Sequence, residues 1–131
     1  GLGDVYKRQE IISVAVGGAL GAVCRYLLGN FISRMSGSAL PWGTFAINII
    51  GCFCMGLLMT LIVERGLLPA VWRLFLCVGL LGGFTTFSSF GYESLMLLTE
   101  GNIAAAAAYS GGSLLLGLVA AGAGVLAGKV V

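Results

Sequence analysis

A stretch of glycine, hydroxyl and aromatic residues holds the side chains of this sequence that are best suited to chemistry. It reads GGFTTFSSF from Gly82 to Phe90 and follows a long apolar run. Phe87 and Phe90 are three residues apart and would share a face of a helix, with Thr86 and Ser89 as a parallel hydroxyl row. A phenyl ring has a positive edge, so two rings presented edge-on can contact a small anion without a full charge that would trap it. The alternative is ordinary packing of two aromatic rings.

Two further polar side chains lie inside otherwise apolar segments. Asn48 follows Thr44 by one helical turn, and its amide suits either a hydrogen bond between helices or a contact with an anion. Arg25 continues a helix face that carries Gly17 and Gly21 at intervals of four. An arginine at the centre of a span costs about 2.5–3.5 kcal/mol. It therefore either reaches to the membrane interface or lines a water-filled vestibule that attracts anions.

The last apolar segment carries two rows of residues at helical spacing. Tyr109, Ser113 and Gly117 form the first row, which offers hydroxyls to a pathway. The second row has small residues at intervals of four over Ala120–Gly128 and is typical of close helix packing. Glu93 follows the aromatic pair, and a carboxylate inside a membrane either has a function or pairs with a polar neighbour.

The composition places all of these residues in a membrane protein. Of 131 residues, 59% are hydrophobic and 9% are charged, whereas soluble domains are about 25% charged. The sequence has no histidine, and its four cysteines lie in apolar segments, which argues against a zinc site, a Cys–His nucleophile and a His-relayed hydrolase. A net charge of +2 is too small for a nucleic-acid-binding surface. The 22 glycines favour helices whose backbones approach closely.

Hydropathy predicts an all-α membrane protein with four transmembrane helices. The predicted spans are Ile11–Ser33, Pro41–Val63, Ala70–Leu98 and Ile103–Ala127. Residues 1–10 would be a polar tail of uncertain origin, and 11–131 a single transmembrane domain. The two glycines and the hydroxyls near the middle of the third span predict a helix broken at membrane depth, with a glycine-kinked helix as the alternative.

The lysines and arginines are divided unevenly between the two faces of such a chain. The face with both termini and the second loop carries Lys7, Arg8, Arg65, Arg73 and Lys129. The opposite face carries one arginine in the first loop, and this difference places both termini in the cytoplasm. Two of the five basic residues belong to the tail, however, so a nearly balanced protein that inserts in both orientations stays open.

Three motifs together resemble the Fluc (CrcB-type) family of fluoride channels. They are GGALGAVCRY at Gly17–Tyr26, PWGTFAIN at Pro41–Asn48 and GGFTTFSSFGYE at Gly82–Glu93. The match covers Val16 to Lys129, and the third motif is highly specific. The resemblance implies a four-span subunit of the plasma (inner) membrane of a prokaryote that forms an antiparallel, dual-topology homodimer. It implies passive fluoride export through two pathways per dimer, and no enzymatic activity.

The resemblance also implies roles for individual residues. Phe87 and Phe90 would flank each fluoride pathway, and Asn48 would lie near them. The polar residues implied to line the pathway or its vestibule are Thr86, Ser88, Ser89, Tyr109, Ser113 and Arg25. The backbone carbonyls of Gly82 and Thr85 in both subunits would hold a structural Na⁺ at the dimer centre.

Two other classes of membrane protein compete with this interpretation. A small four-span drug/proton antiporter also dimerises antiparallel, but it needs a carboxylate deep in its first span. This chain has Arg25 there and no acidic residue between Glu10 and Glu64. A structural subunit without transport predicts scattered polar positions, whereas Asn48 and the hydroxyl clusters all fall near mid-span. Gly117 stands where some relatives of the family would carry another hydroxyl. The sequence therefore does not decide whether the polar row of the last span continues to Gly117.

Overall fold

The computed structural model describes all of residues 1–131 and contains only helices and loops. In chain order the helices are α1 (Leu2–Ser36), α2 (Trp42–Met59), the π-helix η1 (Thr60–Glu64), α3 (Ala70–Trp72), the π-helix η2 (Arg73–Leu81), α4 (Gly82–Phe84), α5 (Phe87–Thr99) and α6 (Ile103–Val130). They combine into four segments that are long and apolar enough to cross a membrane. The prediction of an all-α protein with four spans is therefore confirmed.

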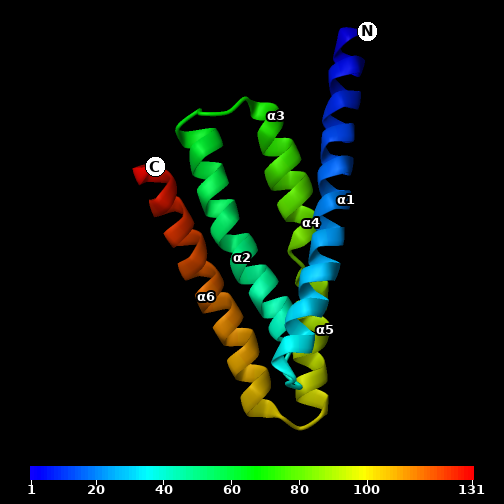
Figure 1. The fold of residues 1–131 in the computed structure, drawn as a ribbon, viewed down its shortest axis with the longest axis vertical. Coiled ribbons are helices and arrows are strands. Elements are labelled where there is room, and N and C mark those ends of the chain that lie inside the picture. The colour runs from blue at the N-terminus through cyan, green and yellow to red at the C-terminus, as the bar shows by residue number, and fades with distance from the viewer.

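The first helix is longer than the sequence indicated. α1 begins at Leu2 instead of near Ile11, so the residues expected to form a tail are helical. The polar residues of this segment include lysine, arginine, glutamine and glutamate, which are strong helix formers. Polarity excludes them from lipid but not from a helix. In Figure 1 this start of α1 projects beyond the other helices.

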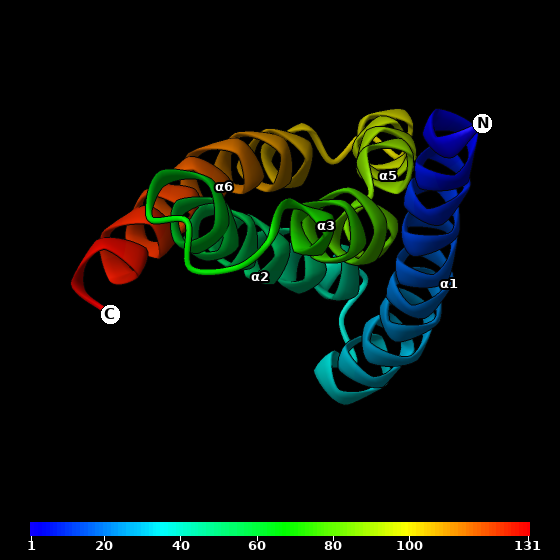
Figure 2. The same ribbon diagram turned by 90° about the horizontal axis from the view of Figure 1, so that it is seen from above.

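The connections between the spans lie at two opposite ends of the molecule. Both termini share one end with the connection from η1 to α3, and the other two connections lie at the far end (Figure 1). Seen from above, α1 and α6 lie at the two sides, with α2 and the third span between them (Figure 2). Each connection contains a glycine with a positive φ, namely Gly37 at 58°, Gly66 at 61° and Gly101 at 81°. This left-handed conformation ends a helix at little steric cost in glycine alone.

Glycines let two pairs of helices approach closely. Gly17 and Gly21 on α1 are buried against the third span, where an added Cβ would overlap the backbone carbonyls of Phe75 and Leu80. Gly124 on α6 packs against the α2 backbone in the same way. In a membrane, where lipid tails give no hydrophobic drive between helices, such backbone contact supplies the packing energy. The predicted packing role of the second small-residue row is thus confirmed.

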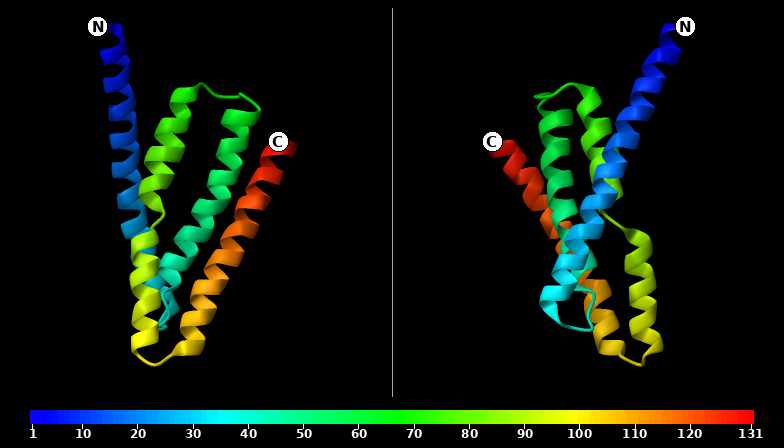
Figure 3. Two further views of the ribbon diagram at one scale, coloured as in Figure 1. Left: turned by 180° about the vertical axis from the view of Figure 1, so that it is seen from behind. Right: turned by 45° about the vertical axis from the view of Figure 1, so that its right-hand side comes forward.

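The third span is broken rather than kinked. α4 ends at Phe84, and the next two residues have extended backbones, with φ −78° and ψ 157° at Thr85 and φ −147° and ψ 119° at Thr86. α5 then starts at Phe87 in a new direction, as the views in Figure 3 show. The segment before α4, η2, is a π-helix, a form that is frequent near functional sites.

The buried side chains form two small clusters, one on each side of the break. Ile47 of α2 packs with Leu81 and Phe84 at the end of the first half of the third span. Leu97 of α5 packs with Ala106 and its neighbours on α6. Most other large apolar side chains are exposed in the single chain. A surface of this kind faces lipid or another subunit.

Candidate functional site

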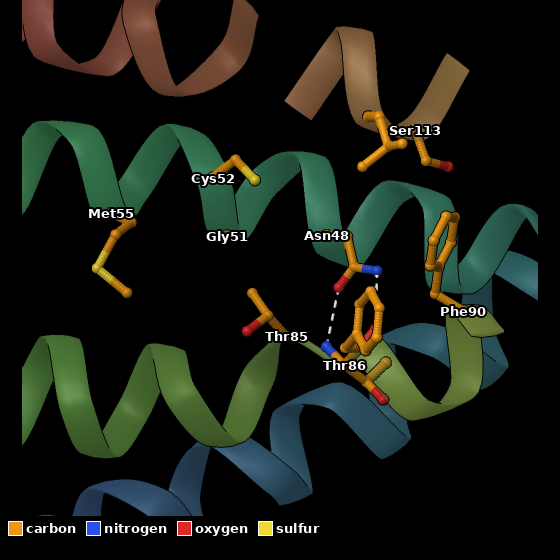
Figure 4. Close-up of a pocket in the computed structure, with 10 residues that line it drawn as sticks. Asn48, Gly51, Cys52, Met55, Thr85, Thr86, Phe90 and Ser113 are labelled. Carbon is orange, nitrogen blue, oxygen red and sulfur yellow. Dashed lines mark hydrogen bonds between the residues drawn. The ribbon is translucent and has the colours of Figure 1, made fainter. Parts of the chain in front are cut away.

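One side chain of α2 is paired with the backbone of the break. The amide Nδ2 of Asn48 donates to the Thr86 carbonyl at 3.0 Å, and its Oδ1 accepts from the Thr86 N–H at 2.9 Å. Figure 4 shows both hydrogen bonds. The amide pairs with the extended peptide much as a neighbouring β-strand would, and it uses one of its two N–H donors to do so. The other N–H stays available.

The threonine hydroxyls complete the break. Thr85 Oγ1 donates to the Leu81 carbonyl at 3.0 Å, and the Thr85 N–H bonds the same carbonyl, so this residue closes α4. Thr86 Oγ1 accepts from the Ser89 N–H at 3.3 Å and serves as the N-cap of α5. Ser88 Oγ lies 3.4 Å from Thr86 Oγ1. Three of the four hydroxyls in the motif therefore bond to, or lie beside, the ends of the two half-helices.

A pocket of about 310 Å³ opens directly beside the break. Its walls are Asn48, Gly51, Cys52, Met55, Thr85, Thr86, Phe87, Phe90, Ser113 and Leu114. α2, α5 and α6 converge on it, and Figure 4 shows Asn48, Phe90 and Ser113 around one space. Three separate segments of the sequence supply five predicted site residues, namely Asn48, Thr86, Phe87, Phe90 and Ser113. The structure brings these five together in one pocket.

The pocket offers weak, unused contacts rather than a full charge. The ring centroids of Phe87 and Phe90 are 6.0 Å apart with an interplanar angle of 42°, and Phe87 is 81% exposed in the single chain. Ser113 Oγ is buried and has no hydrogen-bond partner within the chain. A buried hydroxyl without a partner costs about 1–3 kcal/mol unless a ligand or water satisfies it. Ser113 and the free N–H of Asn48 are therefore donors that a bound anion could use.

A second polar group joins three helices next to the pocket. The Glu93 carboxylate of α5 accepts from Thr44 Oγ1 at 2.9 Å and from the Tyr109 hydroxyl at 3.1 Å. The Tyr109 ring packs on the Phe90 ring with centroids 5.4 Å apart. Tyr109 is thus adjacent to the pocket without lining it, and its hydroxyl proton is engaged. Sequence reasoning had marked Glu93 as a candidate, and the structure supplies its two partners.

Arg25 lies at the break. Its Nε donates to the Gly83 carbonyl at 3.1 Å, and the side chain is partly buried. The two sequence interpretations, reach to the interface or a place in a vestibule, did not include this contact. A guanidinium compensates for the hydrogen bond that the broken helix no longer gives to this carbonyl.

Cys52 and Met55 are pocket residues that sequence reasoning missed. The sequence shows Cys52 only as a cysteine in an apolar segment, yet Cys52 borders the pocket opposite the break. The spacing from Asn48 is four and then three residues, so all three side chains share one face of α2. This shared face is the signal that could have identified them.

Four spanning segments, one of them broken by two extended residues, and a pocket with unpaired donors beside the break are the features of a small membrane transport protein. The family model described as CrcB-like protein, Camphor Resistance (CrcB), matches residues 12–125. The chain therefore belongs to the CrcB-like family, and it is a multi-pass membrane protein.

Curated relatives carry the name fluoride-specific ion channel FluC. The one from Chloroflexus aurantiacus is 50% identical over 121 residues, which cover 92% of this chain and 96% of the relative. Those from Acidobacterium capsulatum and Thermus thermophilus are 44% and 48% identical over 92% and 86% of this chain and over 97% and 88% of their own lengths. These relatives are named as ion channels and not as enzymes.

Proposed function

We propose that this chain is the subunit of a fluoride-selective ion channel that lets fluoride leave the cytoplasm of a prokaryote passively and so lowers its toxicity. The plasma (inner) membrane is the proposed location. The observation that carries the proposal is the pocket beside the break, where phenyl rings and unpaired donors meet in a chain whose relatives are named fluoride-specific channels.

The pocket chemistry suits a small anion that must pass and not stay. Fluoride loses part of its hydration shell on entering a narrow path, and protein donors must replace it. The free N–H of Asn48, the hydroxyl of Ser113 and the ring edges of Phe87 and Phe90 are partial charges only. Weak contacts at several sites favour both binding and release, which conduction requires. The hydroxyls of Ser88 and Ser89 would continue this row along α5.

A pair of antiparallel subunits is the proposed working unit. Four spans are too few to enclose a pore, and the ring of Phe87, which lines the pocket, is exposed in the single chain. A second copy would cover this ring. Without the basic residues of the tail, the two faces differ little in their number of lysines and arginines, and this small difference supports insertion in both orientations.

A structural Na⁺ at the dimer centre is the proposed cofactor. In a continuous helix the Gly82 carbonyl would accept from the Thr86 N–H, and the Thr85 carbonyl from the Ser89 N–H. Both donors are bound elsewhere, to Asn48 Oδ1 and to Thr86 Oγ1. Carbonyl oxygens that have lost their helical hydrogen-bond donors suit a hard cation. A two-fold axis between the subunits would bring four such oxygens together. Such an ion would also offset their partial negative charge near the fluoride path.

The antiporter alternative lacks support from the site. Such a protein exchanges protons through a carboxylate deep in its first span, but the side chain at this depth is Arg25, bonded to the Gly83 carbonyl. The carboxylate of Glu93 belongs to the third span and already accepts hydrogen bonds from two hydroxyl groups.

Purified protein in liposomes loaded with fluoride tests the proposed function. We expect passive fluoride efflux that a fluoride electrode records, with chloride efflux from matched liposomes at the level of empty vesicles. Fluoride efflux no faster than from empty vesicles, or equal permeation of chloride, would contradict the proposal. If an imposed Na⁺ gradient drove fluoride against its own gradient, the protein would be a Na⁺/fluoride symporter and not a channel.

A further inference from the structure

We infer that Asn48 is a positioning residue for the cation site, because it removes the donor that would otherwise occupy the Gly82 carbonyl. The inference rests on the proposed function, and in particular on the proposed structural Na⁺. It assigns to Asn48 a task that is separate from contact with fluoride.

The hydrogen-bond partners around the break carry this inference. A continuous helix would pair the Thr86 N–H with the Gly82 carbonyl, since these groups are four residues apart. Asn48 Oδ1 takes that N–H instead at 2.9 Å. Gly82 itself is exposed in the single chain. Without the amide oxygen, the Thr86 N–H would be free to return to this carbonyl and extend α4 by one residue.

The second hydrogen bond of the amide fixes the direction of the peptide. Nδ2 of Asn48 donates to the Thr86 carbonyl at 3.0 Å, so both polar groups of one residue are held by one side chain. Thr86 stays extended as a result, and its Oγ1 can accept from the Ser89 N–H. That bond frees the Thr85 carbonyl. One amide thus leads to two available carbonyls, directly at Gly82 and through the Thr86 cap at Thr85.

Asn48 also borders the pocket proposed to conduct fluoride. The same amide therefore holds the Thr86 backbone, next to the carbonyls that would bind the cation, and borders the space through which the anion would pass. Loss of this side chain should impair two properties that are measured separately, Na⁺ binding and fluoride flux.

The test compares Na⁺-dependent stability in three variants. Asn48→Ala removes both hydrogen bonds to Thr86. Asn48→Asp keeps an oxygen that accepts the Thr86 N–H but places a negative charge at the pocket. Ser110→Ala is the matched control, since it removes the hydrogen bond from Ser110 to Ser94 at 3.0 Å, which joins α5 to α6 away from the break. The readout is the thermal unfolding midpoint of detergent-solubilised protein, titrated with NaCl at an ionic strength held constant with N-methylglucamine chloride.

We expect Na⁺ to stabilise the parent protein, Ser110→Ala and Asn48→Asp with half-maximal effect at similar concentrations. Asn48→Ala should need at least tenfold more Na⁺. Fluoride flux should fall in both Asn48→Ala and Asn48→Asp. In Asn48→Asp the flux should therefore fall while the Na⁺ dependence of stability stays like that of the parent. If Asn48→Ala does not fold, Asn48→Ser serves in its place, since a serine side chain is too short to take over the amide's contacts with Thr86.

An Asn48→Ala or Asn48→Ser protein whose Na⁺ dependence stays within twofold of the parent would overturn the inference and leave Asn48 as a fluoride contact alone. Loss of the Na⁺ effect in Asn48→Asp would overturn it as well, because the amide oxygen would then not be the decisive group. A parent protein that Na⁺ does not stabilise would refute the cation site. The proposed channel function would not be affected by that result, because fluoride efflux from liposomes tests it separately.

Discussion

The two halves of the third span are held in place by different means. The first half, η2 and α4, packs on α1 through glycines that bring backbone against backbone. The second half, α5, is tied to α2 and α6 by side-chain hydrogen bonds, among them those of Glu93 to Thr44 and Tyr109. The first half should tolerate no added volume, whereas the second half should tolerate small changes of volume but not the loss of particular polar or aromatic groups.

The largest effect is expected in the first half. Gly21→Ala would place a Cβ into the Leu80 carbonyl and 2.9 Å from the Phe84 backbone nitrogen. Neither atom is a flexible side-chain end, so overpacking should cost about 1–3 kcal/mol or more. We expect little folded protein by size-exclusion chromatography and no fluoride efflux.

Gly91→Ala in the second half is the control for this prediction. A Cβ at Gly91 meets no atom within 4 Å in the chain, so the variant should fold and elute as the parent does. A Gly21→Ala protein that is as stable as Gly91→Ala would show that backbone contact does not define the first half.

The next effect concerns function without loss of fold. Phe87→Ala or Phe90→Ala should reduce fluoride efflux from liposomes at least a hundredfold, about 2.7 kcal/mol of barrier, because the ring edges replace part of the anion's hydration. The elution profile of the protein should stay that of the parent. Efflux within about twofold of the parent in both variants would show that the two rings serve only in packing.

A smaller effect is expected at Ser113. Its Oγ is buried without a partner in the chain, so Ser113→Ala removes a contact for the passing ion but breaks no internal hydrogen bond. Fluoride efflux should fall about tenfold, which corresponds to about 1.4 kcal/mol, the size of one hydrogen bond. Thermal stability should be unchanged or slightly higher. A stability loss above about 1 kcal/mol would show that the hydroxyl has a structural partner instead.

The smallest effect is expected for Ser110→Ala. The hydrogen bond from Ser110 to Ser94 joins α5 to α6, but neither residue lines the pocket. Interhelical hydrogen bonds in membranes average about 0.6 kcal/mol, so the unfolding midpoint should fall slightly and fluoride efflux should stay within twofold. A loss of efflux comparable to that of Phe90→Ala would extend the site to this part of α5.

The sequence was informative where the signal is local. Apolar segments of spanning length gave the four spans, and two glycines followed by hydroxyls gave the break, because both depend on the composition of one segment. Asn48 was recognised as a polar residue at mid-span, but its pairing with Thr86 depends on how α2 packs beside the break. The contact of Arg25 with the Gly83 carbonyl was missed for the same reason, since no spacing within one helix encodes it.

The start of α1 and the position of Cys52 at the pocket are two further features that the sequence did not predict. Hydropathy locates the membrane segment, but a helix can continue past it when the polar residues favour helices, as α1 does from Leu2. Cys52 carries no polar signal of its own. Its place in the pocket follows from its helical spacing to Asn48 and from the position of the break, which is a property of the fold.

The most direct test of the central claim, that fluoride passes through the pocket beside the break, uses Cys52. This thiol borders the pocket, and Ag⁺ is a small soft cation that binds thiolates. In a variant with the other three cysteines replaced by serine, we predict that Ag⁺ blocks fluoride efflux in chloride-free medium in proportion to the thiol it occupies, and that a cysteine-free variant is unaffected. Full occupancy of Cys52 by Ag⁺ with unchanged fluoride efflux would contradict the account.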